Sequence, residues 1–150
     1  MQPDQPSPSA DSQAGLVREL GPDDLPQLLD LLDRDADAYC VVAERVVAAQ
    51  LDPLGSGGPT WGWYLDGDLR SAIFVGPNVI LVETTAAARA AFADRLAQVG
   101  RRSSAIVGYR DEVLDLWARL EAAWGPCREV RADQPLMVCT ENPSQEPLAG

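Results

Sequence analysis

The sequence predicts one small α/β domain (equally an α+β domain), in which a central mixed, mostly antiparallel sheet is flanked by helices. Short apolar runs separated by turn residues in the middle of the chain are typical of an antiparallel meander. After them, helical periodicity alternates with short apolar runs, which is typical of strand–helix units. A length of 150 residues suits one domain with its own hydrophobic core.

The N-terminal part is expected to hold one strand and two helices. The first strand is expected at Leu16–Leu20, and the turn at Gly21–Asp24 supplies carboxylates that can cap a helix. Pro26 falls in the first turn of that helix, where its missing N–H costs little. A second helix is expected over about Cys40–Gln50, followed by a Pro/Gly loop at 52–59. The first helix is recognised by leucines on one face: Leu25, Leu28, Leu29 and Leu32.

The meander is predicted from three apolar runs. Thr60–Leu65 and Leu69–Gly76 flank Asp66-Gly67-Asp68, and Asp-Gly between apolar runs is a strong hairpin signal. Asn78–Thr84 is almost continuously apolar, as expected of a central strand that is covered on both faces. These three runs therefore form an antiparallel sheet.

The second half predicts two helices and three strands. Helices are expected at Ala86–Val99 and Asp111–Trp124, on either side of a short strand at Ser103–Val107. Cys127–Val130 and Pro135–Cys139 are expected to be the last two strands. The predicted order is therefore β-α-α-β-β-β-α-β-α-β-β.

The two ends differ in composition from the middle of the chain. Residues 1–15 are rich in Pro, Ser and Gln and are expected to be a disordered tail, and residues 141–150 are expected to be a linker or tail. The domain itself then spans 16–140. The N-terminus lacks the basic and apolar regions of a signal peptide, and no apolar run reaches the length of a membrane span, so we expect a cytoplasmic protein.

The charge balance excludes some partners. The net charge is −11, all 12 basic residues are arginine, and histidine is absent. This balance repels the phosphates of nucleic acids and of anionic membranes. The three cysteines, Cys40, Cys127 and Cys139, are widely spaced and odd in number, which predicts buried reduced thiols and no disulfide framework.

Three groups of residues in the sequence have the composition of a binding site. Trp61 and Trp63 lie on one face of their strand and predict core packing, or else an aromatic wall of a pocket or interface. The glycines of 55–58 precede a strand and not a helix, which predicts a flexible loop and no phosphate site. Asp33, Asp35 and Asp37 mimic part of a calcium loop, but Ala38 replaces the required glycine, so no metal is expected.

The predicted order resembles that of the GNAT acetyltransferases. More specifically, several stretches resemble a domain of unknown function found at the N-terminus of GNAT-family N-acetyltransferases from high-G+C bacteria. The WG…GPC-REVR-x-DQPLM tail is the most specific of them. The matching stretches are AERVVAAQLDP (43–53), WGWYLDGDLRSAIFVGPNVILVE (61–83), GRRSSAIVG (100–108), LWARLEAAWGPCREVR (116–131) and DQPLMV (133–138).

The resemblance implies a GNAT-like fold that lacks its cofactor loop. GNAT enzymes hold the acetyl-CoA pyrophosphate on a glycine-rich loop between the fourth strand and the third helix, where backbone N–H groups face the anion. Here that junction contains Thr84, Thr85 and Ala86 without glycine, and Glu83 adds a negative charge. No cofactor is therefore expected.

The chain also offers poor candidates for the general acid and the general base of GNAT chemistry. General acid–base catalysis favours a group whose pKa lies near 7, and the chain has no histidine. Trp117 occupies the approximate position of the GNAT acid tyrosine. Tyr109, at the entry to the same helix and a poor match for that position, and Glu83 remain as weak catalytic candidates.

The leading hypothesis is a non-catalytic GNAT-like module that supports or regulates a GNAT N-acetyltransferase domain following it in the same chain or lying in a partner chain. Its docking surface would include the sheet edge and the strand that carries Gln134 and Met137. One alternative is an N-acetyltransferase that binds acetyl-CoA through a non-standard loop. A second is a small-molecule sensor, and homo-oligomers are compatible with all three.

Overall fold

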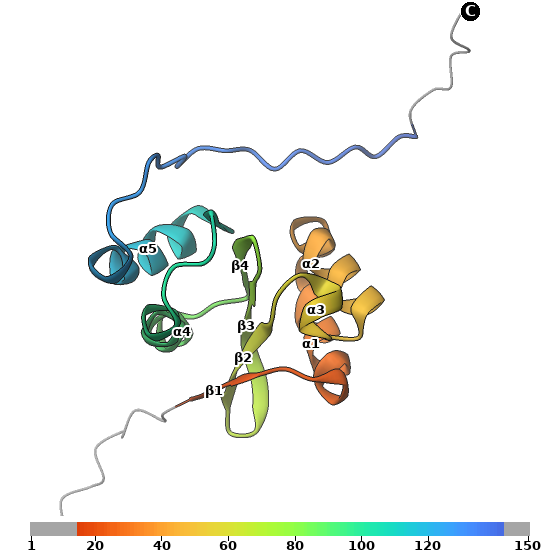
Figure 1. Ribbon diagram of the computed structural model, residues 1–150. Helices are drawn as coiled ribbons and strands as arrows, with labels where there is room; N and C mark the ends of the chain where they lie inside the picture. Colours follow the sequence, from red (N-terminus) through yellow and green to blue (C-terminus); the bar gives the residue numbers. More distant parts are fainter. Residues whose placement is uncertain (1–14, 143–150) are drawn as a thin grey trace, which may run out of the picture.

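The computed structural model describes residues 15–142. The tails predicted at 1–15 and 141–150 lie almost wholly outside these residues. In Figure 1 the described chain forms a sheet with helices on both faces and an extended segment that leaves the last helix. Among residues 15–142, no helix combines the length and the apolar character needed to cross a bilayer.

The sheet has five strands in the spatial order β1-β2-β3-β4-β5. The first four strands pair antiparallel, and β5 pairs parallel to β4, so the predicted mixed, mostly antiparallel sheet is confirmed. The strands are β1 (Leu16–Glu19), β2 (Thr60–Leu65), β3 (Asp68–Val75), β4 (Asn78–Val82) and β5 (Ala105–Val107).

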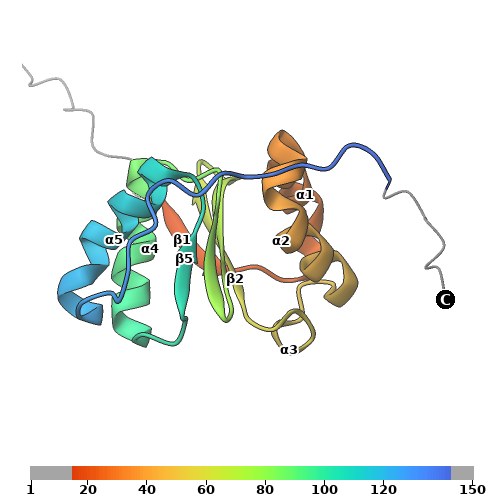
Figure 2. The same ribbon diagram turned by 90° about the horizontal axis from the view of Figure 1, so that it is seen from above.

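Helices cover both faces of the sheet. Helices α1 to α3 lie on one side, and α4 and α5 lie on the other, as Figures 1 and 2 show from two directions. Short 3-10 turns at Pro22–Asp24 and Asp33–Asp35 precede the first two helices. The helices are α1 (Leu25–Leu32), α2 (Ala36–Ala49), α3 (Pro53–Ser56), α4 (Ala86–Val99) and α5 (Arg110–Trp124).

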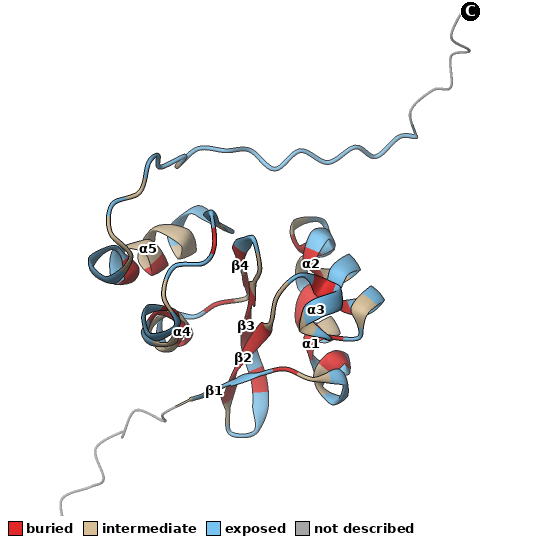
Figure 3. Cartoon of the chain, in the orientation of Figure 1, coloured by how far each residue is buried: buried red, intermediate tan, exposed pale blue. Residues whose placement is uncertain are grey.

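Each face of the sheet buries its own hydrophobic core. The strands alternate, so that Trp61, Trp63 and Ile73 face α4 and α5, whereas Tyr64 and Phe74 face α1 and α2. The central strands are buried on both faces, which Figure 3 shows as red ribbon through the middle of the molecule. The sheet is thus the shared wall of two cores.

Local turn signals place several elements where the sequence predicts them. Asp66 and Gly67 both adopt positive φ (53° and 83°) between β2 and β3, as a two-residue hairpin turn requires. Thr85 caps α4 by accepting a hydrogen bond from the N–H of Ala88 at 3.2 Å. Strand β2 and helix α4 match their predicted bounds.

The last two predicted strands are wrong. The described residues after α5 contain neither helix nor strand, and the segments at 127–130 and 135–139 are extended and mostly exposed. A strand needs a partner to hydrogen-bond, and this segment runs across the end of the sheet toward the α1–α2 side without pairing (Figure 2). The full predicted order, and with it a GNAT fold, is therefore not confirmed.

The prediction of buried thiols is also wrong. All three cysteines are free, but Cys40 and Cys139 are exposed and Cys127 is only half-buried. Cys40 points outward because α2 turns Tyr39, Val42 and Val46 toward the core instead.

An ion pair closes the corner between β1 and α1. Arg18 donates two hydrogen bonds to the Asp24 carboxylate, at 2.8 and 2.7 Å. Asp24 also accepts from the N–H of Gly21 and from the Tyr64 hydroxyl, both at 2.9 Å. The Arg18 guanidinium lies 4.4 Å from the centre of the Tyr64 ring. The hydrogen bonds from Arg18 hold the pKa of Asp24 well below its usual range.

Phe92 tests the packing of the core beneath α4. Its side chain is fully buried, so Phe92→Ala should lower the free energy of unfolding by about 3–5 kcal/mol through lost burial and an unfilled cavity. Urea denaturation measures this. Leu54→Ala, at a side chain that is 93% exposed, is the control and should change stability by less than about 0.5 kcal/mol. A loss below about 1 kcal/mol for Phe92→Ala would contradict the packing.

Asp24 should make stability depend on pH. Because its pKa is lower in the folded state, its contribution is complete above the unfolded value of about 4 and is lost as the pH falls through the folded value. Arg18 is partly exposed and screened by solvent, so Asp24→Asn should cost only about 1 kcal/mol at pH 7.

Urea denaturation at pH 7, 5, 4 and 3 should show the gap between the native protein and Asp24→Asn narrowing below about pH 4. The matched control is Asp68→Asn, which removes an exposed ion pair with Arg70. A gap that stays constant with pH would rule out the ionised carboxylate as its source.

Candidate functional site

The junction between β4 and α4 is built on an unusual backbone angle. Glu83 follows the last residue of β4 and has a φ of 51°, which a residue with a side chain adopts infrequently. The hydroxyl of Ser71 on β3 donates to the Glu83 carbonyl at 2.7 Å and accepts from the N–H of Thr85 at 3.3 Å. One buried serine therefore holds both ends of the turn.

Tyr39 of α2 reaches Glu83 from the other side. Its hydroxyl donates to the Glu83 carboxylate at 3.1 Å, and its oxygen accepts from the Glu83 N–H at 3.2 Å. Arg34 adds an ion pair to the same carboxylate at 3.5 Å. Burial raises the pKa of Tyr39, so the hydroxyl remains a proton donor at all physiological pH values.

Thr84 and Arg89 tie the junction to α5. The Thr84 hydroxyl donates to Glu112 at 2.8 Å, and Arg89 donates to the Thr84 carbonyl at 2.6 Å. The Arg89 side chain, which is only 13% exposed, also donates to Asp115 at 2.6 Å. That hydrogen bond lowers the pKa of Asp115. The Arg89 guanidinium therefore already has hydrogen-bond partners within the protein.

The two weak catalytic candidates from the sequence do not form an acid–base pair. Tyr109 donates its hydroxyl proton to Asp35, and Glu83 bonds Tyr39 and Arg34. The hydrogen bond with Asp35 raises the pKa of Tyr109 and lowers that of Asp35. Both hydroxyl–carboxylate pairs link α2, or the turn before it, to the opposite half of the molecule.

Bonded N–H groups and nearby carboxylates disfavour an acetyl-CoA pyrophosphate at the junction. A pyrophosphate site needs free backbone N–H groups and a positive field. Here the Thr85 side chain occupies the N–H of Ala88, and Ser71 accepts from the Thr85 N–H. The Glu83 and Glu112 carboxylates flank the same turn. An anion would meet negative charge there.

The predicted pocket or interface residues fall in two separate places. Trp61 and Trp63 are 4% and 5% exposed, and the Arg95 guanidinium lies 4.4 Å from the Trp61 ring. They belong to the core beneath α4 and α5 and line no surface. Gln134 and Met137 lie in the exposed extended segment that follows α5.

The remaining motifs act as local structure. Asp35 caps α2 by accepting from the N–H of Ala38 at 3.1 Å, and Asp52 caps α3 by accepting from Gly55 at 2.9 Å. Within residues 15–142, His, Cys, Asp and Glu side chains gather nowhere in a group of three or more that could hold a metal.

Sequence reasoning missed the partners that hold Glu83. Tyr39 and Ser71 lie 44 and 12 residues from Glu83, so no local pattern joins them. Ser71 carried one signal, since it is a polar residue inside an apolar strand, and a buried hydroxyl there needs a partner.

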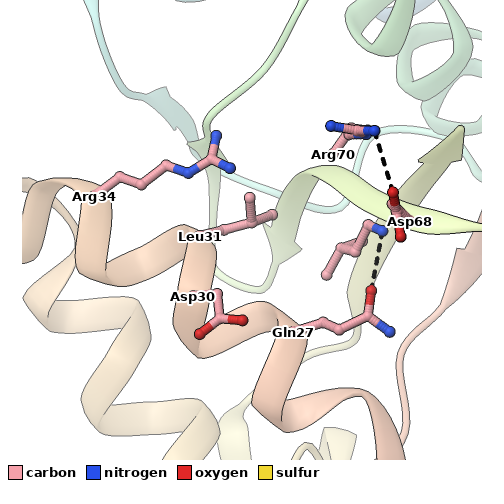
Figure 4. Close-up of a pocket in the computed structure, with 7 residues that line it drawn as sticks. Gln27, Asp30, Leu31, Arg34, Asp68 and Arg70 are labelled. Carbon is pink, nitrogen blue, oxygen red and sulfur yellow. Dashed lines mark hydrogen bonds and ion pairs between the residues drawn. The ribbon is translucent and has the colours of Figure 1, made fainter.

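A shallow hollow of about 320 Å³ lies between α1 and the start of β3 (Figure 4). The Gln27 side chain accepts from the Leu69 N–H at 3.1 Å across its floor, and Arg70 pairs with Asp68 at 3.1 Å on its rim. The side chains of Arg34, Asp68 and Arg70 on its rim are at least half exposed. Because water screens their charges, they would add little to the free energy of binding a charged ligand. Its lining residues are Gln27, Asp30, Leu31, Arg34, Asp68, Leu69 and Arg70.

Comparison with known families places the chain in one of them. The model described as "Domain of unknown function (DUF4081)" matches residues 58–149, which is more than half of the chain. The chain therefore belongs to the DUF4081 family. The match covers β2 through α5 and continues along the extended segment, whereas β1 to α3 precede it. Neither a curated protein nor a solved structure matches the chain.

Tyr39 offers a direct test of the junction. Tyr39→Phe leaves the Glu83 N–H without its partner and the Glu83 carboxylate with Arg34 alone, so we expect a loss of about 1–3 kcal/mol in the free energy of unfolding, measured by urea denaturation. Tyr109→Phe, which removes an exposed hydroxyl–carboxylate bond, is the control and should cost less than about 1 kcal/mol. Equal effects of the two variants would argue against a special role for the Glu83 turn.

Proposed function

We propose that this DUF4081 domain is a non-catalytic module with a GNAT-like fold that supports or regulates an associated N-acetyltransferase domain. The proposal joins the sequence resemblance to the chemistry of the β4–α4 junction. The junction carries most of the weight, since it is where a GNAT enzyme would hold its cofactor.

The order of elements through α5 supports the GNAT-like part of the proposal. A strand and two main helices precede a three-stranded antiparallel meander, and a helix, a parallel strand and a helix follow it. This succession agrees with the GNAT order up to α5. It differs from the GNAT order after α5, where an extended segment stands in place of the terminal strand pair.

The occupied junction supports the non-catalytic part of the proposal. Glu83, Thr84 and Arg89 are committed to hydrogen bonds that hold the fold together. A general acid or base must reach the proton that it transfers, and the hydrogen bonds of these groups are all made within the protein. Such an arrangement suits a module that acts through its surface.

An associated acetyltransferase domain should couple thermodynamically to this one. Thermal melts of the present chain, of the acetyltransferase domain and of the two joined should show a higher midpoint for this domain in the joined form, because binding to the folded state stabilises it. A rise of several degrees is expected for about 1–2 kcal/mol of coupling. Unchanged midpoints in the joined form would refute the supporting role.

Calorimetry with acetyl-CoA separates the proposal from its enzymatic alternative. We expect no binding tighter than about 100 μM, which corresponds to roughly −5.5 kcal/mol. The associated acetyltransferase domain serves as the positive control in the same titration. Tighter binding to the present chain, removed by Thr85→Asp at the start of α4, would favour an N-acetyltransferase with a non-standard loop.

A further inference from the structure

We propose that the chain forms a two-fold dimer in which residues 134–139 of each copy add as a strand to the open edge of β5 in the other copy. The inference concerns copies of this chain, and it uses the sheet edge and the segment with Gln134 and Met137 that the leading sequence hypothesis assigned to docking. It rests on the open edge of β5, on one free extended segment and on the direction in which that segment runs.

The outer edge of β5 is open. Among residues 15–142, β5 pairs only with β4, so one side of its backbone has no ladder partner. Val107 on this strand is 47% exposed, and Val41 of α2 is exposed beside a small hollow that reaches Ile80. An open edge with apolar neighbours favours the addition of another strand.

The segment at 134–139 is extended, and its backbone has no pairing partner among the described residues. Its sequence, Gln-Pro-Leu-Met-Val-Cys, is apolar except at its start, and Leu136, Met137 and Val138 are between 53% and 87% exposed. Among the described residues its backbone donates to and accepts from no other backbone group. Leaving so much apolar surface in water is unfavourable, and a partner strand would cover part of it.

The geometry points to the edge of another copy. Asp133 is held by Arg110 at 2.9 Å, and Arg110 begins α5 just after the end of β5. From there the segment runs outward toward the α1–α2 side, across the direction of β5 and not along it (Figure 2). Pairing with its own β5 would require the segment to turn sharply out of this direction after Asp133.

In a symmetric dimer, each copy supplies a partner for the open β5 edge and for the exposed segment of the other copy. A surface that carries an open edge and a free extended segment is complementary to itself, so a two-fold axis pairs each segment with the other copy's edge. The extended peptide then gains main-chain hydrogen bonds as an added strand does in peptide recognition. The family match includes both β5 and the segment, so the family shares the two parts that would meet.

Sedimentation equilibrium and light scattering between about 10 and 300 μM test the proposal, and the native chain should be a dimer. Met137→Pro and Val138→Pro are made separately. Since alternate N–H groups point to one side, one of the two should weaken dimerisation at least tenfold by removing a ladder bond. Leu136→Asp should weaken it too. The controls, Thr140→Pro just beyond the strand and Leu54→Asp on α3, should leave the dimer intact.

Hydrogen exchange locates the interface. Backbone amides of Leu136–Cys139 and of β5 should be protected in the dimer and lose that protection in the monomeric variant, while circular dichroism shows that the fold persists. A chain that stays monomeric up to 300 μM overturns the proposal, whether its segment amides exchange freely or are protected by its own β5. A dimer that all three segment variants leave intact overturns it as well.

Discussion

The left-handed turn at Glu83 decides where the second half of the chain goes. A residue with a side chain in this region carries a conformational cost of about 1 kcal/mol or more, so neighbouring groups must hold it there. Ser71 fixes its carbonyl from β3, and Tyr39 fixes its N–H from α2. Because the turn sends the chain from the sheet to the far face, the placement of α4, β5 and α5 depends on it.

The same cluster joins the two halves that the sheet separates. The Tyr39–Glu83 and Tyr109–Asp35 pairs each link the α1–α2 side to an element that follows β4. The polar groups gathered at this end of the sheet could have formed an active site, as such groups do at the carboxyl ends of strands in other α/β proteins. Here these groups are hydrogen-bonded to one another across the two sides, so the contacts that hold the fold together also occupy the Glu83 and Asp35 carboxylates.

Local signals predicted the elements that depend on them, and long-range pairing was the point of failure. The Asp66-Gly67 hairpin and the capped start of α4 follow from turn and capping residues next to them. Strand character at 135–139 was predicted from composition, but a strand also needs an edge, and the pattern of one segment cannot supply it. The tie between Tyr39 and Glu83 escaped for the same reason, because it spans 44 residues.

The boundary of the family match is not a boundary of the fold. The match begins at residue 58, yet the preceding β1 to α3 supply Tyr39 and Asp35 and cover one whole face of the sheet. Without these elements Phe74 and Val82 would be exposed to solvent, and the Glu83 turn would lose Tyr39 as its partner on α2. A chain cut at residue 58 would therefore expose one core and release the junction. The unit that must fold together therefore runs from β1 to α5.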